Sequence, residues 1–305
     1  MKILIVGGVK AEITEKTRDY YDKYVDFFKR STLINDQDTI VESSLTGDLI
    51  ISVGDGEFSI YDTRNNRDLA EYNAFFIRGD NLRVHLDVIA TINEYAKIKA
   101  IPIINDYSGV RDSSKLLQAV LFHKISAPVA RTVYVNTAVI NNEDRLDWTF
   151  PSILKATHGS HGNDNFVVAS MDEVRSRLIE QPSKIFVLQR LVPNDGDYRI
   201  LIIGDEVLVI ERKAVNGSHL NNTSQGGTAS MATIDSLPPE MITKSIEIMK
   251  DQGKTIGGVD ALIDKNTKEI FFLEVNAQPQ LMSGAFVEEK ERMIAKLLKD
   301  LSHKS

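Results

Sequence analysis

The chain contains no cysteine among its 305 residues. Disulfide bonds, thiolate metal sites and cysteine nucleophiles are therefore excluded, and the absence is typical of a reducing compartment. No apolar stretch approaches the length of a membrane span, and the first residues, MKILIVGG, have too short an apolar core for a signal peptide. We therefore expect a soluble, cytoplasmic protein with no membrane partner.

Positive charge is also scarce. The 36 lysine and arginine residues stand against 43 aspartate and glutamate residues, which leaves a net charge of −7, and no basic run stands out. Because binding to a phosphate backbone depends on clustered positive charge, a nucleic-acid partner is disfavoured. The composition, 42% hydrophobic and 26% charged, is that of an ordinary globular chain long enough for two or three compact units.

Alternating strands and helices predict an α/β unit with a parallel sheet over residues 1–110. The expected strands are Lys2–Val6, Asp48–Val53, Ala74–Ile77 and Ile101–Ile104. Leu82, Leu86, Ile89, Ile92 and Ala96 follow helical spacing on one face, which serves the core or an interface between copies. The first strand ends in Gly7-Gly8, but the G-x-G-x-x-G fingerprint is missing, so a dinucleotide site is disfavoured.

Two α+β units are predicted next, over residues 111–188 and 189–305. A helix is expected after the capping residues Asp112 and Ser113, and its inner face is formed by Leu116, Leu117, Val120 and Leu121. Further strands are expected at 132–135, 153–156, 166–169, 185–188, 198–203 and 207–212, and further helices at 171–180, 238–254 and 288–301.

The most informative segment is FFLEVNAQP, from Phe271 to Pro279, which follows GGVDALID across a short polar turn. Both segments are typical of strands. Side chains two apart share a face of a strand, so Glu274 and Asn276 point the same way, and Asp260 joins them if the strands pair as a hairpin. Two carboxylates and an amide oxygen suit magnesium, which takes its remaining ligands from water and phosphate. A half-polar, solvent-facing hairpin is the alternative, but a charge inside so apolar a run is costly when it is unpaired.

Lys155 ends a predicted apolar strand and leads into the loop THGSHGN. Small polar residues and two glycines let backbone N–H groups approach an anion, and the lysine adds positive charge. The loop is equally explained as a mobile turn, since the Walker A spacing is absent. His158 and His161 are more simply polar loop residues than metal ligands, because no third ligand is evident nearby.

Charged residues also mark the expected hairpin at 198–212. Asp197 and Arg199 share a face, and Arg212 closes the second strand. Arginines at such positions clamp phosphate and developing negative charge, although surface ion pairs explain them as well. Asn222, in the loop NNTSQGG, offers an amide group to a metal or a carboxylate.

Taken together, residues from Lys115 to Leu281 resemble an ATP-grasp ligase of the RimK-type branch, which includes ribosomal-protein glutamate ligases and is similar to glutathione synthetases. The blocks that carry the resemblance are QRLVPNDGDYRILIIGDEVLVIERKA, NNTSQGGTAS, GGVDALID and FFLEVNAQP. The resemblance implies an ATP-grasp fold: a preATP-grasp α/β domain at 1–110, a central lobe at 111–188 and a C-terminal lobe at 189–305, with ATP between the two lobes.

The resemblance also implies a role for each site residue. Those expected to bind the nucleotide are Lys115 and Lys155 at the phosphates, Gln189, Arg190, Leu191 and Val192 as the adenine-pairing hinge, Leu273 on the base, Asp197 at the ribose and Asn222 in the nucleotide loop. Those expected at the metal are Asp260, Glu274 and Asn276. The chain departs from its relatives at Arg190, where they carry glutamate, at Gln225, where arginine is frequent, and at Gln280, which replaces glycine.

The implied reaction is ATP-dependent ligation of a carboxylate to an amine through an acylphosphate, with ATP and two magnesium or manganese ions. Arg212, Arg199 and the Gly227 N–H are the expected catalytic groups, and Arg78 is placed to meet a substrate carboxylate or to form an ordinary salt bridge. The expected partners are an amino acid or peptide and an amine acceptor, and relatives suggest a homo-oligomer. The alternatives are an enzyme that cross-links a ribosomally made peptide, a small-molecule kinase of the same fold, and a nucleotide-binding module without turnover.

Overall fold

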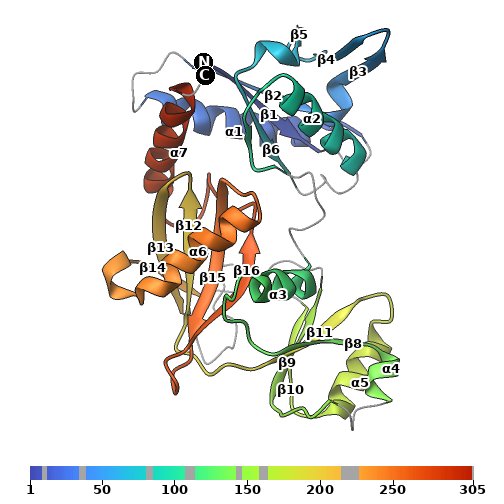
Figure 1. The fold of residues 1–305 in the computed structure, drawn as a ribbon, viewed down its shortest axis with the longest axis vertical. Helices are drawn as coiled ribbons and strands as arrows, with labels where there is room; N and C mark the ends of the chain where they lie inside the picture. Colours follow the sequence, from blue (N-terminus) through green and yellow to red (C-terminus); the bar gives the residue numbers. More distant parts are fainter. Residues whose placement is uncertain are drawn as a thin grey trace.

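A computed structural model describes residues 1–8, 12–33, 39–79, 85–106, 114–141, 146–157, 164–213 and 227–303. Figure 1 shows three bodies: an N-terminal α/β unit at the top, a C-terminal lobe in the middle and a central lobe at the bottom. The likeness to an ATP-grasp fold is visible in the two antiparallel sheets of the lobes, which lie next to each other below the parallel sheet of the first unit (Figure 1). None of the described helices is long and apolar enough to cross a membrane.

The N-terminal unit is built on a parallel sheet with the strand order β2-β1-β6-β7. Its strands are β1 (Lys2–Gly7), β2 (Ile40–Leu45), β6 (Ala74–Arg78) and β7 (Ile103–Ile104), and its helices are α1 (Glu15–Leu33) and α2 (Leu86–Ile98). Ile3 and Ile5 face one apolar cluster while Leu4 and Val6 face another, so β1 is buried on both sides, as parallel strands are. The α/β prediction for this unit is confirmed.

The strand expected near Asp48–Val53 exists, but it does not belong to the parallel sheet. β3 (Leu49–Gly54) pairs antiparallel with β4 (Glu57–Asp62), which pairs with β5 (Arg67–Asp68). The turn Gly54-Asp55-Gly56 has positive φ throughout, which permits the tight reversal between β3 and β4. A local hairpin therefore replaces the expected parallel neighbour.

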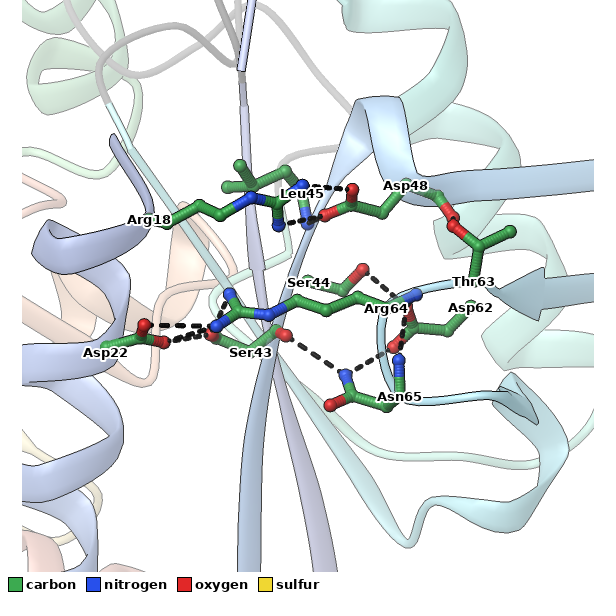
Figure 2. Close-up of polar contacts among 10 residues, drawn as sticks. All are labelled: Arg18, Asp22, Ser43, Ser44, Leu45, Asp48, Asp62, Thr63, Arg64 and Asn65. Atoms are coloured by element: carbon green, nitrogen blue, oxygen red, sulfur yellow. Dashed lines mark hydrogen bonds and ion pairs between the residues drawn. The ribbon is translucent and has the colours of Figure 1, made fainter. Parts of the chain in front are cut away.

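A polar network attaches this small sheet to α1 and β2 (Figure 2). Arg18 makes a two-pronged contact with Asp48, at 2.8 and 3.1 Å, and Arg64 donates to Asp22 at 2.7 Å. Asp62 is fully buried and accepts from the Ser44 hydroxyl at 2.8 Å. Each guanidinium has a carboxylate of its own, so the network is closed.

The expected helix at 82–96 is α2, which begins at Leu86 in the structure, and Leu82 lies outside the described residues. Ile89, Ile92 and Ala96 are fully buried in the core of the unit. This face therefore serves the core, and homo-oligomer formation stays a prediction.

The central lobe is an antiparallel sheet with the order β10-β9-β11-β8, and all four strands were expected. The elements are β8 (Thr132–Val135), α4 (Thr137–Ile140), β9 (Ser152–Ala156), β10 (Asn165–Val168), α5 (Met171–Glu180) and β11 (Phe186–Arg190). Leu154, Val174 and Phe186 are among the residues of its own apolar core.

Helix α3 (Lys115–Lys124) precedes this lobe, and Ser114 caps it through a hydrogen bond from the Leu117 N–H at 3.3 Å. The expected caps Asp112 and Ser113 lie outside the described residues. The expected inner face is wrong in part: Val120 is exposed, whereas Gln118 is buried. The reason is that α3 packs on β16 of the C-terminal lobe, where Phe122 joins the core of that lobe. The boundaries at 110 and 188 stay predictions.

The C-terminal lobe is an antiparallel sheet with the order β14-β13-β12-β15-β16. Its elements are β12 (Asp197–Ile203), β13 (Glu206–Lys213), β14 (Thr228–Ala232), α6 (Pro239–Asp251), β15 (Ile256–Ile263), β16 (Ile270–Asn276) and α7 (Val287–Ser302). Helix α6 covers one face, and α7 packs on α1 of the first unit. One apolar cluster therefore joins β1 and α1 to β12, β13 and α7.

Candidate active site

A row of charged side chains crosses one face of the C-terminal sheet. The strand registers place Asp197 opposite Arg212, Arg199 opposite Asp260, and Asp260 opposite Glu274. The predicted hairpin of β15 and β16 is confirmed. Five residues that the sequence singled out therefore lie side by side on four adjacent strands.

Ion pairs link the members of this row. Arg199 Nε and Nη2 lie 2.8 and 2.7 Å from the two oxygens of Asp260, and Arg212 Nη2 lies 3.0 Å from Asp260 Oδ2. Arg212 Nε also donates to Asp197 at 2.6 Å. Burial alone favours the neutral carboxyl of Asp260, but Arg199 and Arg212 outweigh it and hold the pKa of Asp260 below its usual range. The carboxylate therefore stays charged although it is buried.

Burial disfavours the charged forms of both Asp197 and Arg212, but neighbouring charges overcome this effect only for Arg212. Burial raises the pKa of Asp197 despite the adjacent Arg212. Burial disfavours the charged form of Arg212 as well, but Asp260 and Asp197 overcome it and raise the pKa of the guanidinium. Arg212 is thus a permanent charge held between two carboxylates.

Glu274 lies on the same face as Asp260 because of an irregularity in the pairing of β15 and β16, which the sequence pattern does not predict. The register runs from Asp260↔Glu274 to Ala261↔Phe272, so Leu273 is an extra residue without a partner, a β-bulge. Phe271 faces away from the core. Under strict alternation Leu273 would face the same way as Phe271, and Glu274 would face the core. The bulge instead places Leu273 and Glu274 together on the polar side, while Phe272 and Val275 are buried in the core.

Asp260, Glu274 and Asn276 offer the oxygen atoms that magnesium prefers. Glu274 is half-exposed. Asp260 Oδ1 accepts one hydrogen bond, from Arg199 Nε, so among the described contacts it keeps a lone pair for a metal. Asn276 lies opposite Gly258 on the neighbouring strand, two residues from Asp260. Among the described ranges, no group of three His, Cys, Asp or Glu side chains could hold a metal, so the amide oxygen of Asn276 completes the candidate set.

Two lysines lie beside these carboxylates. Lys115 Nζ is 3.9 Å from Glu274 Oε2, and Lys155 donates to Gln189 Oε1 at 2.7 Å. The loss of hydration around Lys155, together with the charge of Lys115, lowers the pKa of Lys155 to about 8 although Glu274 opposes the change. Both lysines therefore lie near Glu274, at one end of the charged row, and their role at the nucleotide phosphates stays a prediction.

A small apolar cluster joins the two lobes near the expected hinge. It consists of Ala130, Val192 and Leu262, with Phe271 and Leu273 packed against them. β11 ends at Arg190, so Leu191 and Val192 continue beyond the strand pairing. Apolar side chains such as Leu273 are of the kind that packs on a flat base, and both the adenine contact of Leu273 and the backbone pairing of the hinge stay predictions.

Arg190, the residue that departs from the family pattern, does not face the carboxylates. Its guanidinium lies 4.9 Å from the centre of the Phe271 ring. With Val129 and Ile270 it lines a pocket of about 690 Å³ at the Ile270 end of β16, whereas the metal candidates lie toward the Asn276 end.

Gly227 immediately precedes β14, whose Ala229 pairs with Arg212, so its N–H lies at the Arg212 side of the sheet. Asn222, His158 and His161 lie outside the described residues, as do the loop at 158–163 and most of 215–228. The role of Gly227 stays a prediction.

Two amide side chains that were not predicted from the sequence hold β16, the strand that carries Glu274 and Asn276, in place. Gln118 of α3 donates to Val275 O at 3.1 Å and accepts from Val275 N at 2.9 Å, which completes the edge strand between Glu274 and Asn276. Asn105 bridges Ile256 and Ala277 from the N-terminal unit. The available signal for Gln118 was its position three residues before Leu121, which places both side chains on the same side of the helix.

Arg78 lies apart from the row but contacts the loop that follows Asn276. It is 3% exposed, and its Nη2 donates to Pro279 O at 2.8 Å. Within the described part of the chain it forms no salt bridge, so the simpler of the two expectations for Arg78 is not supported.

Comparison with known proteins agrees with this geometry. The curated relatives include a probable alpha-L-glutamate ligase 2 of Shewanella sp. strain W3-18-1, 26% identical over 215 residues that cover 64% of this chain and 69% of that protein. A probable alpha-L-glutamate ligase of Cellvibrio japonicus strain Ueda107 is 28% identical over 177 residues, 56% of each chain.

Similar solved structures extend over nearly the whole chain. The ATP-grasp ligase PsnB, complexed with a minimal precursor, matches with a TM-score of 0.69 and 16% identity over 98% of both chains. The macrocyclase MdnC from Microcystis aeruginosa MRC, bound with precursor peptide MdnA, has a TM-score of 0.66 and 13% identity over 98% of this chain and 100% of the other. At these identities the likeness concerns the fold.

Fold, charged row and relatives together define an ATP-grasp ligase of the carboxylate–amine class. A model of the RimK-like ATP-grasp domain matches residues 110–297, and the chain belongs to that family. The family uses ATP and magnesium, and a PsnB complex that is similar in structure holds Mg and ADP.

Proposed function

We propose that this protein activates a carboxylate with ATP as an acylphosphate and couples it to the amine of an amino acid or peptide. The observation that carries the proposal is the convergence of Asp260, Glu274 and Asn276 with Arg199 and Arg212 on one face of the sheet. Such a site can hold a metal with phosphates and can also stabilise negative charge that develops next to them.

Asp260, Glu274 and Asn276 would hold magnesium or manganese, and we propose two ions. When bound, the metal neutralises the phosphate oxygens and orients them for transfer. Lys115 and Lys155 reach the same region and would bind the phosphates. Their placement next to Glu274 supports this assignment.

The adenine would bind beside the apolar cluster at the junction of the two lobes. Leu273 would pack on the base, with the backbone of Gln189 to Val192 at its edge, while Asp197 would reach the ribose. Asp197 already accepts from Arg212 through Oδ1, so its second oxygen is the one proposed for the ribose. Arg190 would contribute its backbone only, since its side chain stacks on Phe271.

The second half of the reaction forms an oxyanion when the amine attacks the acyl carbon. Arg212, with Arg199 beside it and the Gly227 N–H at the same side of the sheet, would stabilise this charge. Arg212 Nη1 makes no contact with another described residue, so it has donors for a ligand. One such donor contributes about 3 to 4 kcal/mol, or two to three decades in rate.

The proposal is tested by measuring phosphate and ADP release from Mg·ATP across a panel of amino acids, dipeptides and peptides, with Glu274→Ala as the control. Release that needs both a carboxylate and an amine, and that is lost in Glu274→Ala, supports a ligase. Phosphate that remains attached to the product would instead establish a kinase. Release that persists unchanged in Glu274→Ala would contradict the metal assignment.

A second candidate is an enzyme that closes amide or ester cross-links within a ribosomally made peptide. It is favoured by the likeness in fold to PsnB and MdnC over 98% of this chain, including the N-terminal unit. The panel separates the two candidates, because an internal cross-link removes one water from a single peptide, whereas ligation joins two molecules.

A further inference from the structure

The guanidinium of Arg78 is buried, and no carboxylate of the described residues pairs with it. One of its five N–H donors is accounted for by Pro279 O, and the group lies 4.5 Å from the centre of the Tyr24 ring of α1. The Nε and Nη1 atoms are buried and have no hydrogen-bond partner. Three N–H donors are therefore available on a charged group that is 3% exposed.

This arrangement is costly unless an anion completes it. A buried charge that lacks a partner is strongly unfavourable, and arginine cannot shed its proton to avoid that cost. Elsewhere in the same unit the chain pairs its arginines: Arg18 meets Asp48 and Arg64 meets Asp22 (Figure 2). Because these arginines have carboxylate partners, the lack of a described carboxylate at Arg78 is better explained by a ligand that binds there than by a packing defect.

The place of Arg78 in the sheet is also where ligands bind. Arg78 and Gly79 lie at the carboxyl end of β6, beside Gly7 at the carboxyl end of its parallel neighbour β1. The chain leaves β1 toward β2 on one side and leaves β6 toward β7 on the other, so the strand order reverses between them. Crevices at such reversals are the usual ligand sites of open parallel sheets.

Tyr21 of α1 holds the backbone at this position. Its hydroxyl donates to Arg78 O at 2.9 Å, and a Cβ atom at either Gly7 or Gly79 would overlap its ring or hydroxyl. The strand ends are therefore fixed by close packing, which gives Arg78 a defined position.

A short chain of contacts links these strand ends to β16, the strand that carries Glu274 and Asn276. The side chain of Gln278 accepts from Gly79 N at 2.8 Å and donates to Gly79 O at 3.0 Å, and its own N–H donates to Asn276 Oδ1 at 3.0 Å. Pro279, which contacts Arg78, is three residues after Asn276, a span of at most about 11 Å. The two places are therefore separated along the chain by no more than the length of a short peptide.

We propose that Arg78 binds a carboxylate of the substrate other than the one that reacts. The inference rests on the proposed function, which places the reacting carboxylate next to Asp260 and Glu274. It names the substrate class: an amino acid or peptide with two carboxylates, one activated and one held at the carboxyl ends of β1 and β6. Specificity then comes from the N-terminal unit, whereas the chemistry belongs to the C-terminal lobe.

The first test measures binding without turnover. The protein is saturated with magnesium and the non-hydrolysable analogue AMPPNP and titrated with L-glutamate and with glycyl-L-glutamate. Each probe is repeated in its two singly amidated forms, so that each carboxylate is neutralised in turn. Wild-type protein, Arg78→Gln and Arg67→Gln are compared, because Arg67 is an arginine of the same unit that pairs with Glu42 and Glu71 instead.

We expect one of the two probes to bind wild type, and one of its amidated forms to bind about 30-fold more weakly or worse, as is typical when one partner of a buried charge pair is removed. Arg78→Gln should lose that discrimination, while Arg67→Gln should keep it. The inference is overturned if Arg78→Gln discriminates as wild type does, or if neither probe shows saturable binding to wild type.

Thermal unfolding separates ligand binding from a purely structural role. An arginine kept for stability should lower the unfolding midpoint when it is replaced, whereas one left unpaired for a ligand should leave the midpoint of Arg78→Met equal to or above that of wild type. A lower midpoint together with unchanged binding would also overturn the inference. The proposed function fails separately, through phosphate release that does not depend on Glu274.

Discussion

Two groups of arginines and aspartates in this molecule are arranged in opposite ways. Around the three-stranded sheet each arginine has its own carboxylate, Arg18 with Asp48 and Arg64 with Asp22 (Figure 2). In the charged row of the C-terminal lobe, Arg199 and Arg212 share Asp260, and Glu274 lies half-exposed beside them. A closed network attaches one element to another, whereas a shared network keeps donors and acceptors for ligands.

Replacing Glu274 should separate the two networks most sharply. Glu274→Gln should lower kcat/KM by about a thousandfold, because a bound metal supplies several kcal/mol of charge stabilisation and each 1.36 kcal/mol is tenfold in rate. The unfolding midpoint should stay near that of wild type, since the Glu274 side chain is 39% exposed. Steady-state phosphate release and thermal melts measure both quantities.

The matched change in the closed network is Asp48→Asn. It removes the two-pronged contact with Arg18, so the unfolding midpoint should fall while activity per folded molecule is retained. If Asp48→Asn lost activity as Glu274→Gln does, the functional difference between the networks would not hold.

Arg212→Ala should have the next largest effect. Loss of an oxyanion donor slows turnover by roughly two to three decades, whereas the KM for ATP should change little. Arg212→Lys keeps the charge but not the planar fork, so its turnover should remain closer to that of the alanine variant than to wild type. A kcat within a few-fold of wild type in Arg212→Ala would refute the role, and Arg64→Ala is the control from the closed network.

Gln118→Leu should weaken the apparent affinity for Mg²⁺ by about 10- to 100-fold, the usual cost of losing a residue that positions a metal ligand. The leucine fills the space but cannot satisfy the backbone of Val275 between Glu274 and Asn276. Turnover against magnesium concentration gives the measurement. Asn65→Leu, which loses contacts to Ser43 and Asp62, should destabilise the fold without shifting the magnesium curve.

The smallest expected effect is the uptake of protons when ATP binds next to Lys155. With its pKa lowered to about 8, Lys155 is about half charged in the free protein at pH 8, and nucleotide phosphates should restore the full charge. ATP binding at pH 8 should therefore take up roughly half a proton, and Lys155→Arg should take up less. Calorimetry in two buffers of different ionisation enthalpy measures the uptake, and equal values for both proteins would exclude the role.

The same lysine makes stability depend on pH. Its pKa is about 8 in the folded protein against an ordinary value of 10.5, so the unfolded chain binds more protons between these values. The contribution of Lys155 to stability therefore rises as the pH increases from about 8 toward 10.5 and is lost as the pH falls through 8. Lys155→Met should flatten this dependence, and the part that remains is expected from Lys290, whose pKa burial also lowers to about 8.

The hairpin that carries Asp260, Glu274 and Asn276 could be predicted because period-two alternation and oxygen ligands are local properties of the sequence. The bulge at Leu273 could not, since it becomes visible only when β16 is aligned with β15. The prediction thus placed the right side chains on one face while missing the device that puts Glu274 there.

Most of the features that the sequence did not predict depend on contacts between residues far apart in the chain. α1 and β2 were not expected, although α1 buries four aromatic residues, Tyr21, Tyr24, Phe27 and Phe28, against the sheet and α7. Gln118 and Asn105 act on backbone groups more than 150 residues away, a distance over which no spacing rule applies. Val120 was assigned to an inner face because helical periodicity does not say which neighbour a helix meets.

The packing of α7 on α1 has a consequence for how the protein is made. Arg30 pairs with Glu291, and one apolar cluster includes both Phe28 and Leu298, so α1 shares a core with α7, which lies much later in the sequence. During translation, more than two hundred residues must be added after α1 before α7 can cover its aromatic face. A nascent chain in that interval exposes apolar surface, which is the condition in which chaperones bind and aggregation competes with folding.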